Sequence, residues 1–318
     1  HPLGGAQQAG FLGQHGDFQD VGDVVGLGDD AVGHGGLAVA QVGRPGGAED
    51  GQLAPALLGL ACNANASLLI GGDAVNQASA TSILDIVFAI DTSGSMSDDI
   101  AAIGAKARSV ITNLSCPTTD CYVRARFMGI TTTSGIFDET VRGYVLGAGG
   151  TPVTNHQEDN GPAVTDLVNH YAWNNDAVAG QSYYRAIVTI GDEGTEDGQT
   201  VNQADWNAAY VANQAAKNAG IFLFSWVADD PYSGVPDLFN KMATGGSGGI
   251  STVYNFSDTG GAYISGPLTD VTVEQQLQDI ICLASSGGTG GTGVPEPASM
   301  ALLGLGFAGM AALRRRRG

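Results

Sequence analysis

Short apolar runs alternate with longer segments of helical spacing from residue 82 to residue 285. The first run, SILDIVFAI at residues 82–90, is apolar almost throughout, which is typical of a strand covered on both faces. The segment that follows, residues 97–114, repeats apolar side chains with the period of an amphipathic helix. Because strands that alternate with helices pair in parallel, the pattern predicts an α/β fold with a doubly wound, mostly parallel sheet and helices on both faces, a Rossmann-like arrangement.

The same pattern sets the bounds of the domain, which we place at residues 67–284. Pro162 fits the first turn of a helix, and Gly220 fits the end of another. Further strands are expected at residues 121–131, 184–191, 221–228 and 250–256, with 141–147 as another strand candidate. Further helices are expected at residues 161–173, 199–220, 236–243 and 271–284.

The segments before the domain carry less information. Residues 1–52 show neither helical nor strand periodicity, and a propeptide, a disordered arm or a mis-set gene start are all compatible with them. Residues 53–66 form a short apolar stretch that ends in Ala64-Asn65-Ala66, the small-x-small pattern that signal peptidase cleaves. We interpret this stretch as the end of a signal peptide, with a buried strand or helix of the fold as the alternative.

The charge of the chain excludes two classes of partner. The formal net charge is -19, and the chain holds 13 Lys and Arg against 32 Asp and Glu. Four of these cations stand together at residues 314–317, so the remainder is more acidic still. Binding to nucleic acid or to an anionic membrane depends on neutralising phosphates with Lys and Arg. We therefore expect neither nucleic acid nor an anionic lipid surface as a partner.

The C-terminal end reads as a sorting tail. A Gly/Ser/Thr linker at residues 285–293 leads into residues 294–318, where Pro295, Glu296 and Pro297 precede an uncharged apolar run at residues 298–313 and the arginine cluster. Such a run, ended by cations, is expected to form a transmembrane helix with its basic end in the cytoplasm. The tail resembles the PEP-CTERM sorting signal. The resemblance implies processing by an exosortase-type peptidase and an exported protein of a Gram-negative, matrix-producing bacterium, at the cell surface or outside the cell.

The chemistry of the domain centres on DTSGS, residues 91–95, directly after the first apolar strand. A carboxylate at Asp91 with hydroxyls at Ser93 and Ser95 can converge on one hard cation from a single tight turn. Mg²⁺ takes near-octahedral oxygen ligands and keeps several waters, so one acid and two hydroxyls form a plausible partial shell. The alternative is an Asx-type turn that caps the following helix and binds nothing.

Two stretches resemble the metal-ion-dependent adhesion site of von Willebrand factor A domains. DIVFAIDTSGSM, residues 85–96, looks like the first motif, and AIVTIGDEG, residues 186–194, looks like the later motif, whose acid is Asp192. The resemblance implies that Asp91, Ser93, Ser95 and Asp192 hold Mg²⁺, with Ca²⁺ or Mn²⁺ as alternatives. It also implies cation-dependent adhesion to an extracellular protein or polysaccharide.

The third element of that family is a Thr in a loop before a helix, and here the sequence departs from the pattern. The equivalent position holds Glu158, while Thr151 and Thr154 would need a longer loop. An additional carboxylate lowers the net positive charge of a bound cation and makes Ca²⁺ more competitive. A purely structural cation therefore stands beside capture of an acidic ligand. The acidic stretch at residues 191–198 is either a second Ca²⁺ loop or a solvated turn.

Three cysteines fall in the domain, at Cys116, Cys121 and Cys282. In a doubly wound sheet all three would lie at the edge opposite the cation site, and export favours a disulfide. Cys116 with Cys121 is the simplest pairing, and Cys282 with either of them is the alternative.

Catalysis is not expected. A phosphoryl-accepting Asp91 of the haloacid-dehalogenase type wants a second Asp two residues on, where this chain has Ser93, and no G-x-S-x-G, H-E-x-x-H or Walker A motif occurs. His156 and His170 are the histidines of the domain. The sequence therefore predicts a binding module, with a structural matrix protein as the alternative and a metal-dependent hydrolase as the more distant one.

Overall fold

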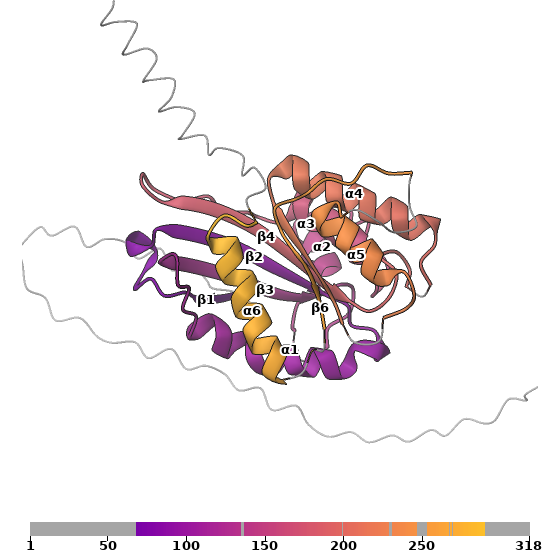
Figure 1. The fold of residues 1–318 in the computed structure, drawn as a ribbon, viewed down its shortest axis with the longest axis horizontal. Coiled ribbons are helices and arrows are strands. Elements are labelled where there is room, and N and C mark those ends of the chain that lie inside the picture. Colours follow the sequence, from indigo (N-terminus) through magenta and orange to yellow (C-terminus); the bar gives the residue numbers. More distant parts are fainter. Residues whose placement is uncertain are drawn as a thin grey trace, which may run out of the picture. The chain divides into compact units, whose positions relative to one another are not determined.

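The computed structural model describes residues 68–134, 137–198, 200–228, 231–246, 253–266, 268 and 270–289 (Figure 1). Its strands are β1 (Leu68–Gly71), β2 (Ser82–Ile90), β3 (Cys121–Gly129), β4 (Ser182–Gly191), β5 (Phe222–Val227) and β6 (Tyr263–Ser265). Its helices are α1 (Ser97–Thr112), α2 (Val141–Gly147), α3 (Asn160–His170), α4 (Gln203–Ala219), α5 (Val235–Thr244) and α6 (Asp270–Ser285), with short 3-10 helices at Gln77–Ser79 and Gly94–Met96.

Within these residues the strands form one sheet in the order β1-β3-β2-β4-β5-β6. All neighbouring strands pair in parallel except β1, which runs antiparallel to β3 at one edge. The expected doubly wound, mostly parallel sheet is thus confirmed. Because β3 follows β2 on one side and β4 lies on its other side, the strand order reverses next to β2. Ligands of open α/β sheets bind at the carboxyl ends of the strands at such a switch point.

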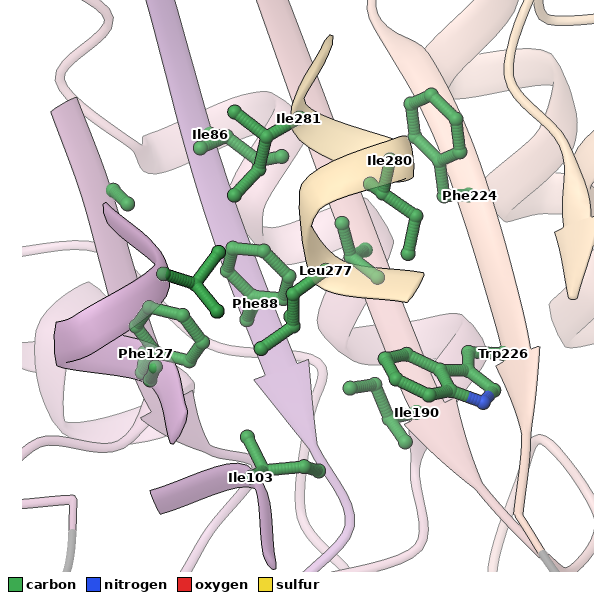
Figure 2. Packing of buried hydrophobic residues seen from close by; sticks show 14 of the residues in the cluster. Ile86, Phe88, Ile103, Phe127, Ile190, Phe224, Trp226, Leu277, Ile280 and Ile281 are labelled. Atoms are coloured by element: carbon green, nitrogen blue, oxygen red, sulfur yellow. The ribbon is translucent and has the colours of Figure 1, made fainter. Parts of the chain in front are cut away.

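The two faces of the sheet are covered by different helices. Side chains alternate along β2, so Phe88 packs in the layer with α1 and α6, whereas Val87 packs in the layer with α3, α4 and α5. Figure 2 shows Leu277 and Ile281 of α6 lying over Phe88 and its neighbours in the first of these layers. Phe88 also stacks on Phe127 of β3, with ring centroids 4.2 Å apart. Burial on both faces explains why β2 reads as an almost continuous apolar run.

A charged cluster interrupts this apolar run near its start. Asp85 of β2 is buried, and its carboxylate lies 2.5 Å from Arg124 of β3. The hydroxyl of Tyr183 (2.7 Å) and the backbone N–H of Asn174 (2.9 Å) donate to the other oxygen of Asp85. Burial opposes the charged form of Arg124, but its hydrogen bond to Asp176 and the charge of Asp85 outweigh this and raise the pKa of the guanidinium. The buried charge is therefore fully partnered.

Some predicted elements differ from the structure. Residues 141–147 form the helix α2 and not a strand: the Thr140 hydroxyl accepts the N–H of Gly143 at 2.9 Å, and Val141 and Val145 share one buried face. The predicted strand at 250–256 is absent from its described part, residues 253–256. The strand that pairs with β5 is instead β6, three residues long.

The ends of the domain also differ in detail from the expectation. β1 begins at Leu68, next to the predicted start of the domain, but was not predicted as a strand. At the other end, α6 extends to Ser285, and Thr289 donates its N–H to Gly260 at 2.9 Å, so the start of the expected linker packs on the domain. The unassigned residues 1–52, the predicted signal peptide end at 53–66, the rest of the linker and the sorting tail lie outside the described residues. Among the helices that are described, none has the length and apolar character needed to cross a bilayer.

The disulfide joins Cys116 to Cys282, so the simplest pairing, Cys116 with Cys121, is wrong. Cys121 is a free, buried thiol. Cys282 reaches Cys116 because α6 packs against α1 and ends beside the loop that precedes β3. All three cysteines lie at the edge of the sheet where the parallel strands begin, as expected. The nine residues of β2 separate this edge from Asp91 by about 30 Å at ~3.3 Å per residue.

Candidate metal centre

Asp91 follows the last residue of β2 and stands at the switch point of the sheet. Its N–H bonds to the carbonyl of Ile190 in β4 at 2.9 Å, which extends the β2–β4 pairing by one residue. The side chain is fully buried, and its Oδ1 accepts the N–H of Ser93 at 2.7 Å. The Asx turn weighed from the sequence is therefore present and occupies one carboxylate oxygen, but Asp91 does not cap the following helix α1, whose N-cap is Met96.

The second oxygen of Asp91 is left without a partner. Oδ2 is buried and accepts no hydrogen bond, and the same is true of Oδ1 of Asp192, which follows β4. Burial raises the pKa of Asp91 well above its usual value, and the charges of Asp192 and Glu158 raise it further. Burial also raises the pKa of Asp192, with a contribution from the charge of Glu193. Two mutually repelling carboxylates with unpaired buried oxygens fit a divalent cation, which would supply the missing partner.

The two serines lie beside these carboxylates. The hydroxyls of Ser93 and Ser95 are 2.8 Å apart, and Ser95 also forms a side-chain hydrogen bond with Asp192 that lowers the pKa of that acid. Ser93 is buried, whereas Ser95 is exposed. The turn after β2 and the end of β4 thus meet through Ser95. The structure brings together four of the predicted ligands, Asp91, Ser93, Ser95 and Asp192, although whether they hold a cation stays a prediction.

Glu158 approaches this group from the loop before α3. It is buried, its Oε2 lies 2.9 Å from Nδ1 of His156, and its charge acts on Asp91. Burial and the charge of Glu193 raise the pKa of Glu158. Oε2 also lies against Gly198, where an added Cβ would come within 2.1 Å of it. Glu158 therefore belongs to the surroundings of Asp91, but its carboxylate is directed to the loops beside it.

The two threonines weighed against Glu158 fit less well. Thr154 is buried, but its hydroxyl donates to Asp166 at 2.6 Å, and the same carboxylate accepts its N–H at 2.9 Å. Thr151 is exposed. In the described part of the chain, no three side chains of His, Cys, Asp or Glu lie close enough together to hold a metal ion by themselves. A cation at this edge would therefore depend on Asp91 and Asp192 together with the serine hydroxyls and water.

The acidic stretch after β4 is held in place by its neighbours. Asp159, at the start of α3, accepts the N–H of Asp197 at 3.0 Å, and Asp205 of α4 accepts the N–H of Glu196 at 2.9 Å. The other oxygen of Asp159 accepts two more backbone N–H groups, and that of Asp205 accepts one. These carboxylates are used as acceptors for the loop backbone, which favours a structural turn over a second Ca²⁺ loop.

Sequence reasoning missed two residues that shape the site. Glu193 sits next to Asp192, and its charge acts on both Asp192 and Glu158. Asn160 is fully buried, accepts a hydrogen bond from Thr189 of β4, and lies so close to Gly191 that an added Cβ there would meet its Nδ2 at 2.5 Å. The acid at 193 stands beside a predicted ligand, which was a usable signal, whereas nothing local marks Asn160.

Comparison with known proteins identifies the tail. Residues 293–317 match the PEP-CTERM protein-sorting motif. The motif indicates an exported, surface-sorted protein with a C-terminal membrane anchor before processing, and it implies recognition by an exosortase-type peptidase. No curated protein matches the chain.

Among solved structures, the chain is similar to proximal thread matrix protein 1 from the mussel byssus, with 10% sequence identity and a TM-score of 0.36. The match covers 68% of this chain and 48% of that protein, so the chain spans about half the length of its structural neighbour.

Proposed function

We propose that this exported protein carries a von Willebrand factor A-type domain that binds an extracellular protein or polysaccharide through a divalent cation at the switch point of its sheet. The observation that carries the proposal is the pair of buried, unpartnered oxygens on Asp91 and Asp192, next to the hydroxyls of Ser93 and Ser95. A cation there would neutralise two acids whose pKa values are raised by burial and by the charges of neighbouring acids. Mg²⁺ suits such a shell, and Ca²⁺ or Mn²⁺ are the alternatives.

A cation that only stabilises a matrix protein is the second candidate, and burial favours it. Asp91 is fully enclosed, Ser93 and Asp192 are nearly so, and Ser95 is the exposed member of the set. A partner's carboxylate would therefore have to reach the cation past Ser95. We expect neither candidate to involve catalysis.

Thermal melting of the full chain in EDTA, Mg²⁺, Ca²⁺ and Mn²⁺ tests the cation site. The wild type is expected to gain stability with at least one cation, since a ligand at 100 times its Kd contributes about 2.7 kcal/mol. Asp192→Asn is expected to lose that gain. Asp120→Asn is the matched control, because Asp120 is an exposed acid at the opposite edge. Equal melting temperatures of the wild type in every cation and in EDTA would contradict the proposal.

A substitution at the exposed surface of the site distinguishes a ligand-binding cation from a purely structural one. Ser95→Tyr places a large side chain at the exposed hydroxyl, whereas Thr118→Tyr places one at an exposed position of the opposite edge. A binding site predicts that the Ser95 variant loses adhesion to isolated extracellular matrix while the Thr118 variant retains it. A structural cation predicts equal adhesion by both variants and a lower melting temperature for the Ser95 variant alone.

A further inference from the structure

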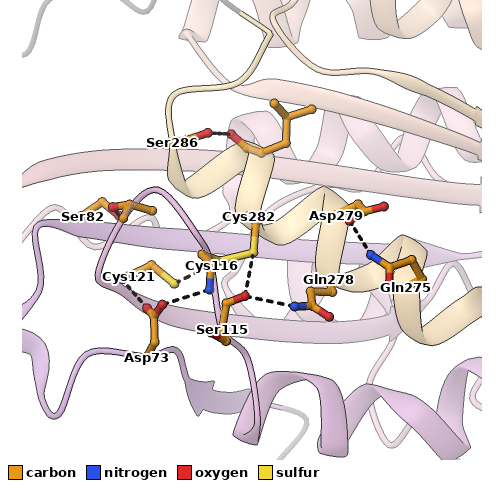
Figure 3. The surroundings of a disulfide bond; sticks show 12 residues. Asp73, Ser82, Ser115, Cys116, Cys121, Gln275, Gln278, Asp279, Cys282 and Ser286 are labelled. Atoms are coloured by element: carbon orange, nitrogen blue, oxygen red, sulfur yellow. Dashed lines mark hydrogen bonds between the residues drawn. A yellow bond between two sulfur atoms is a disulfide. The ribbon is translucent and has the colours of Figure 1, made fainter.

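The three cysteines of the domain lie together at the edge of the sheet opposite Asp91. The disulfide between Cys116 and Cys282 joins positions 166 residues apart in the sequence, with a Cα–Cα distance of 5.2 Å. The thiol of Cys121 is fully buried and points at this bond, with its Sγ 3.6 Å from Sγ of Cys116 (Figure 3). A free thiol is therefore in contact with one sulfur of a disulfide, and the other sulfur belongs to α6.

The Asp73 carboxylate holds the backbone of two cysteines: Cys116, in the loop before β3, and Cys121, the first residue of β3. Asp73 accepts the N–H of Cys116 at 2.9 Å and the N–H of Cys121 at 2.8 Å (Figure 3). Burial opposes the charge of Asp73, but these two hydrogen bonds outweigh it and lower the pKa of the acid. Because Asp73 holds both backbone positions, Cys116 and Cys121 stay close to each other whichever cysteine is bonded to Cys116.

We propose that Cys116, Cys121 and Cys282 form an intramolecular thiol–disulfide exchange site, in which Cys121 displaces Cys282 and leaves a free thiol on α6. When a local opening admits solvent to this edge, hydroxide takes the proton of the Cys121 thiol. The thiolate then attacks Sγ of Cys116, the Cys116–Cys121 bond forms, and the Cys116–Cys282 bond breaks. The electron pair leaves with the sulfur of Cys282, which takes up a proton, so the step consumes no oxidant or reductant.

The exchanged state, with the Cys116–Cys121 bond, differs from the resting state, with the Cys116–Cys282 bond, in that α6 carries a free thiol. In the resting state Cys282 is half-buried and ties the last helix to the loop before β3. After exchange no covalent bond holds the helix, and it is kept in place by packing of side chains such as Leu277 and Ile281 (Figure 2) and by polar contacts such as the hydrogen bond from Gln278 to the Ser115 carbonyl. The thiol of Cys282 then becomes available for a disulfide with another chain, while the bond between Cys116 and Cys121 remains inside the domain.

The surroundings of Cys121 keep the resting state in place near neutral pH. Burial raises the pKa of the thiol to about 11; the Asp73 carboxylate faces it from the segment after β1 and Ser285 faces it from α6. Since thiol–disulfide exchange proceeds through the thiolate, its rate below this pKa rises about tenfold per pH unit.

Trapping of Cys282 tests the proposal in the full chain. Cys62→Ser is introduced throughout, so that of the four cysteines only the three in the domain remain. The protein is held with iodoacetamide and no added thiol, then unfolded and mapped by mass spectrometry. Alkylation of Cys282 is expected to be about 100-fold faster at pH 10 than at pH 8. Cys121→Ser, the matched control, is expected to leave Cys282 unmodified, and far-ultraviolet circular dichroism verifies the fold at both pH values.

A second variant asks whether Cys116 and Cys121 can bond at all. Cys282→Ser is expected to form a Cys116–Cys121 disulfide on air oxidation. The proposal is overturned if Cys282 is trapped no faster than in Cys121→Ser, or if Cys282→Ser keeps two free thiols. Trapping that depends on Cys121, together with the bond in Cys282→Ser, supports it.

Discussion

Replacing Asp91 by Asn is expected to raise the stability of the cation-free protein and to abolish its response to cations. Oδ1 of Asp91 accepts the N–H of Ser93, a role that the amide oxygen of Asn retains. Oδ2 has no partner and lies in the field of Asp192 and Glu158. The amide removes the repelling charge and supplies an N–H donor at that position. The substitution therefore relieves a defect that exists only without a cation.

The magnitude follows from the cost of that defect. A buried acceptor without a partner costs about 1–3 kcal/mol, so Asp91→Asn is expected to gain this amount in EDTA. For a domain of about 200 residues, 1 kcal/mol corresponds to roughly 2–4 °C in Tm. The wild type should recover about 2.7 kcal/mol with a cation at 100 times its Kd, whereas the variant should recover nothing. Asp91→Asn is thus expected to be more stable than the wild type in EDTA, and this difference in unfolding free energy is expected to vanish or change sign in Mg²⁺.

Urea unfolding at pH 7, with EDTA or Mg²⁺, measures both quantities on the same samples. Asp120→Asn serves as the control, since it removes one exposed carboxylate at the far edge. If Asp91→Asn is less stable than the wild type in EDTA and both proteins respond equally to Mg²⁺, the carboxylate of Asp91 is a satisfied structural acceptor. That result would refute the reasoning from the unpartnered oxygen.

Other features of the structure give predictions of their own. The raised pKa values of Asp91 and Asp192 mean that the folded state binds protons more tightly than the unfolded state. The cation-free protein should therefore lose stability as the pH rises above 3.8 through these raised values. Urea unfolding in EDTA between pH 4 and 7 would show this trend, and Mg²⁺ should weaken it. Arg124→Ala leaves the carboxylate of Asp85 buried without its cation, and a loss of about 3–5 kcal/mol in unfolding free energy is expected; a loss below 1 kcal/mol would mean that water replaces the guanidinium. Cys116→Ala removes the long-range disulfide and should cost about 2–5 kcal/mol, measured against the oxidised wild type, with no difference once both are reduced.

Several parts of the fold follow from local sequence alone. The strands β2, β4 and β5 are buried on both faces, so their apolar runs stand out without knowledge of their neighbours. The turn at Asp91 is predictable for the same reason, because it follows directly after such a run. Asp192 was placed beside Asp91 by the resemblance to the von Willebrand factor A motifs, and the parallel pairing of β2 with β4, whose carboxyl ends meet at one edge of the sheet, agrees with that placement.

The short elements could not be predicted in this way. β1 has four residues and lies in a stretch whose composition also suits a leader, and β6 has three. α2 has seven residues, too few for a period of 3.6 to be told from a period of 2. Their type is decided by contacts with β3, β5 and α3, which the local sequence does not contain.

The disulfide pairing, and the choice between Glu158 and a threonine as the third element of the predicted cation site, also depend on contacts between residues distant in the sequence. Cys282 pairs with Cys116 because α6 packs along α1, an arrangement that the spacing of the cysteines does not encode. Thr154 is unavailable as a ligand because Asp166 takes its hydroxyl, which becomes visible only once the loop is folded.

The residues that follow α6 show at which edge of the sheet the chain leaves the domain. Gly288 packs beside Phe222 at the start of β5, and Thr289 bonds to Gly260, so the described chain leaves the domain at the edge where the parallel strands begin. The sorting motif follows at residues 293–317. Any anchor attached through this motif is therefore joined to the edge of the sheet where the parallel strands begin. The edge that carries Asp91 and Ser95 is at the other end of the strands, away from the attachment point.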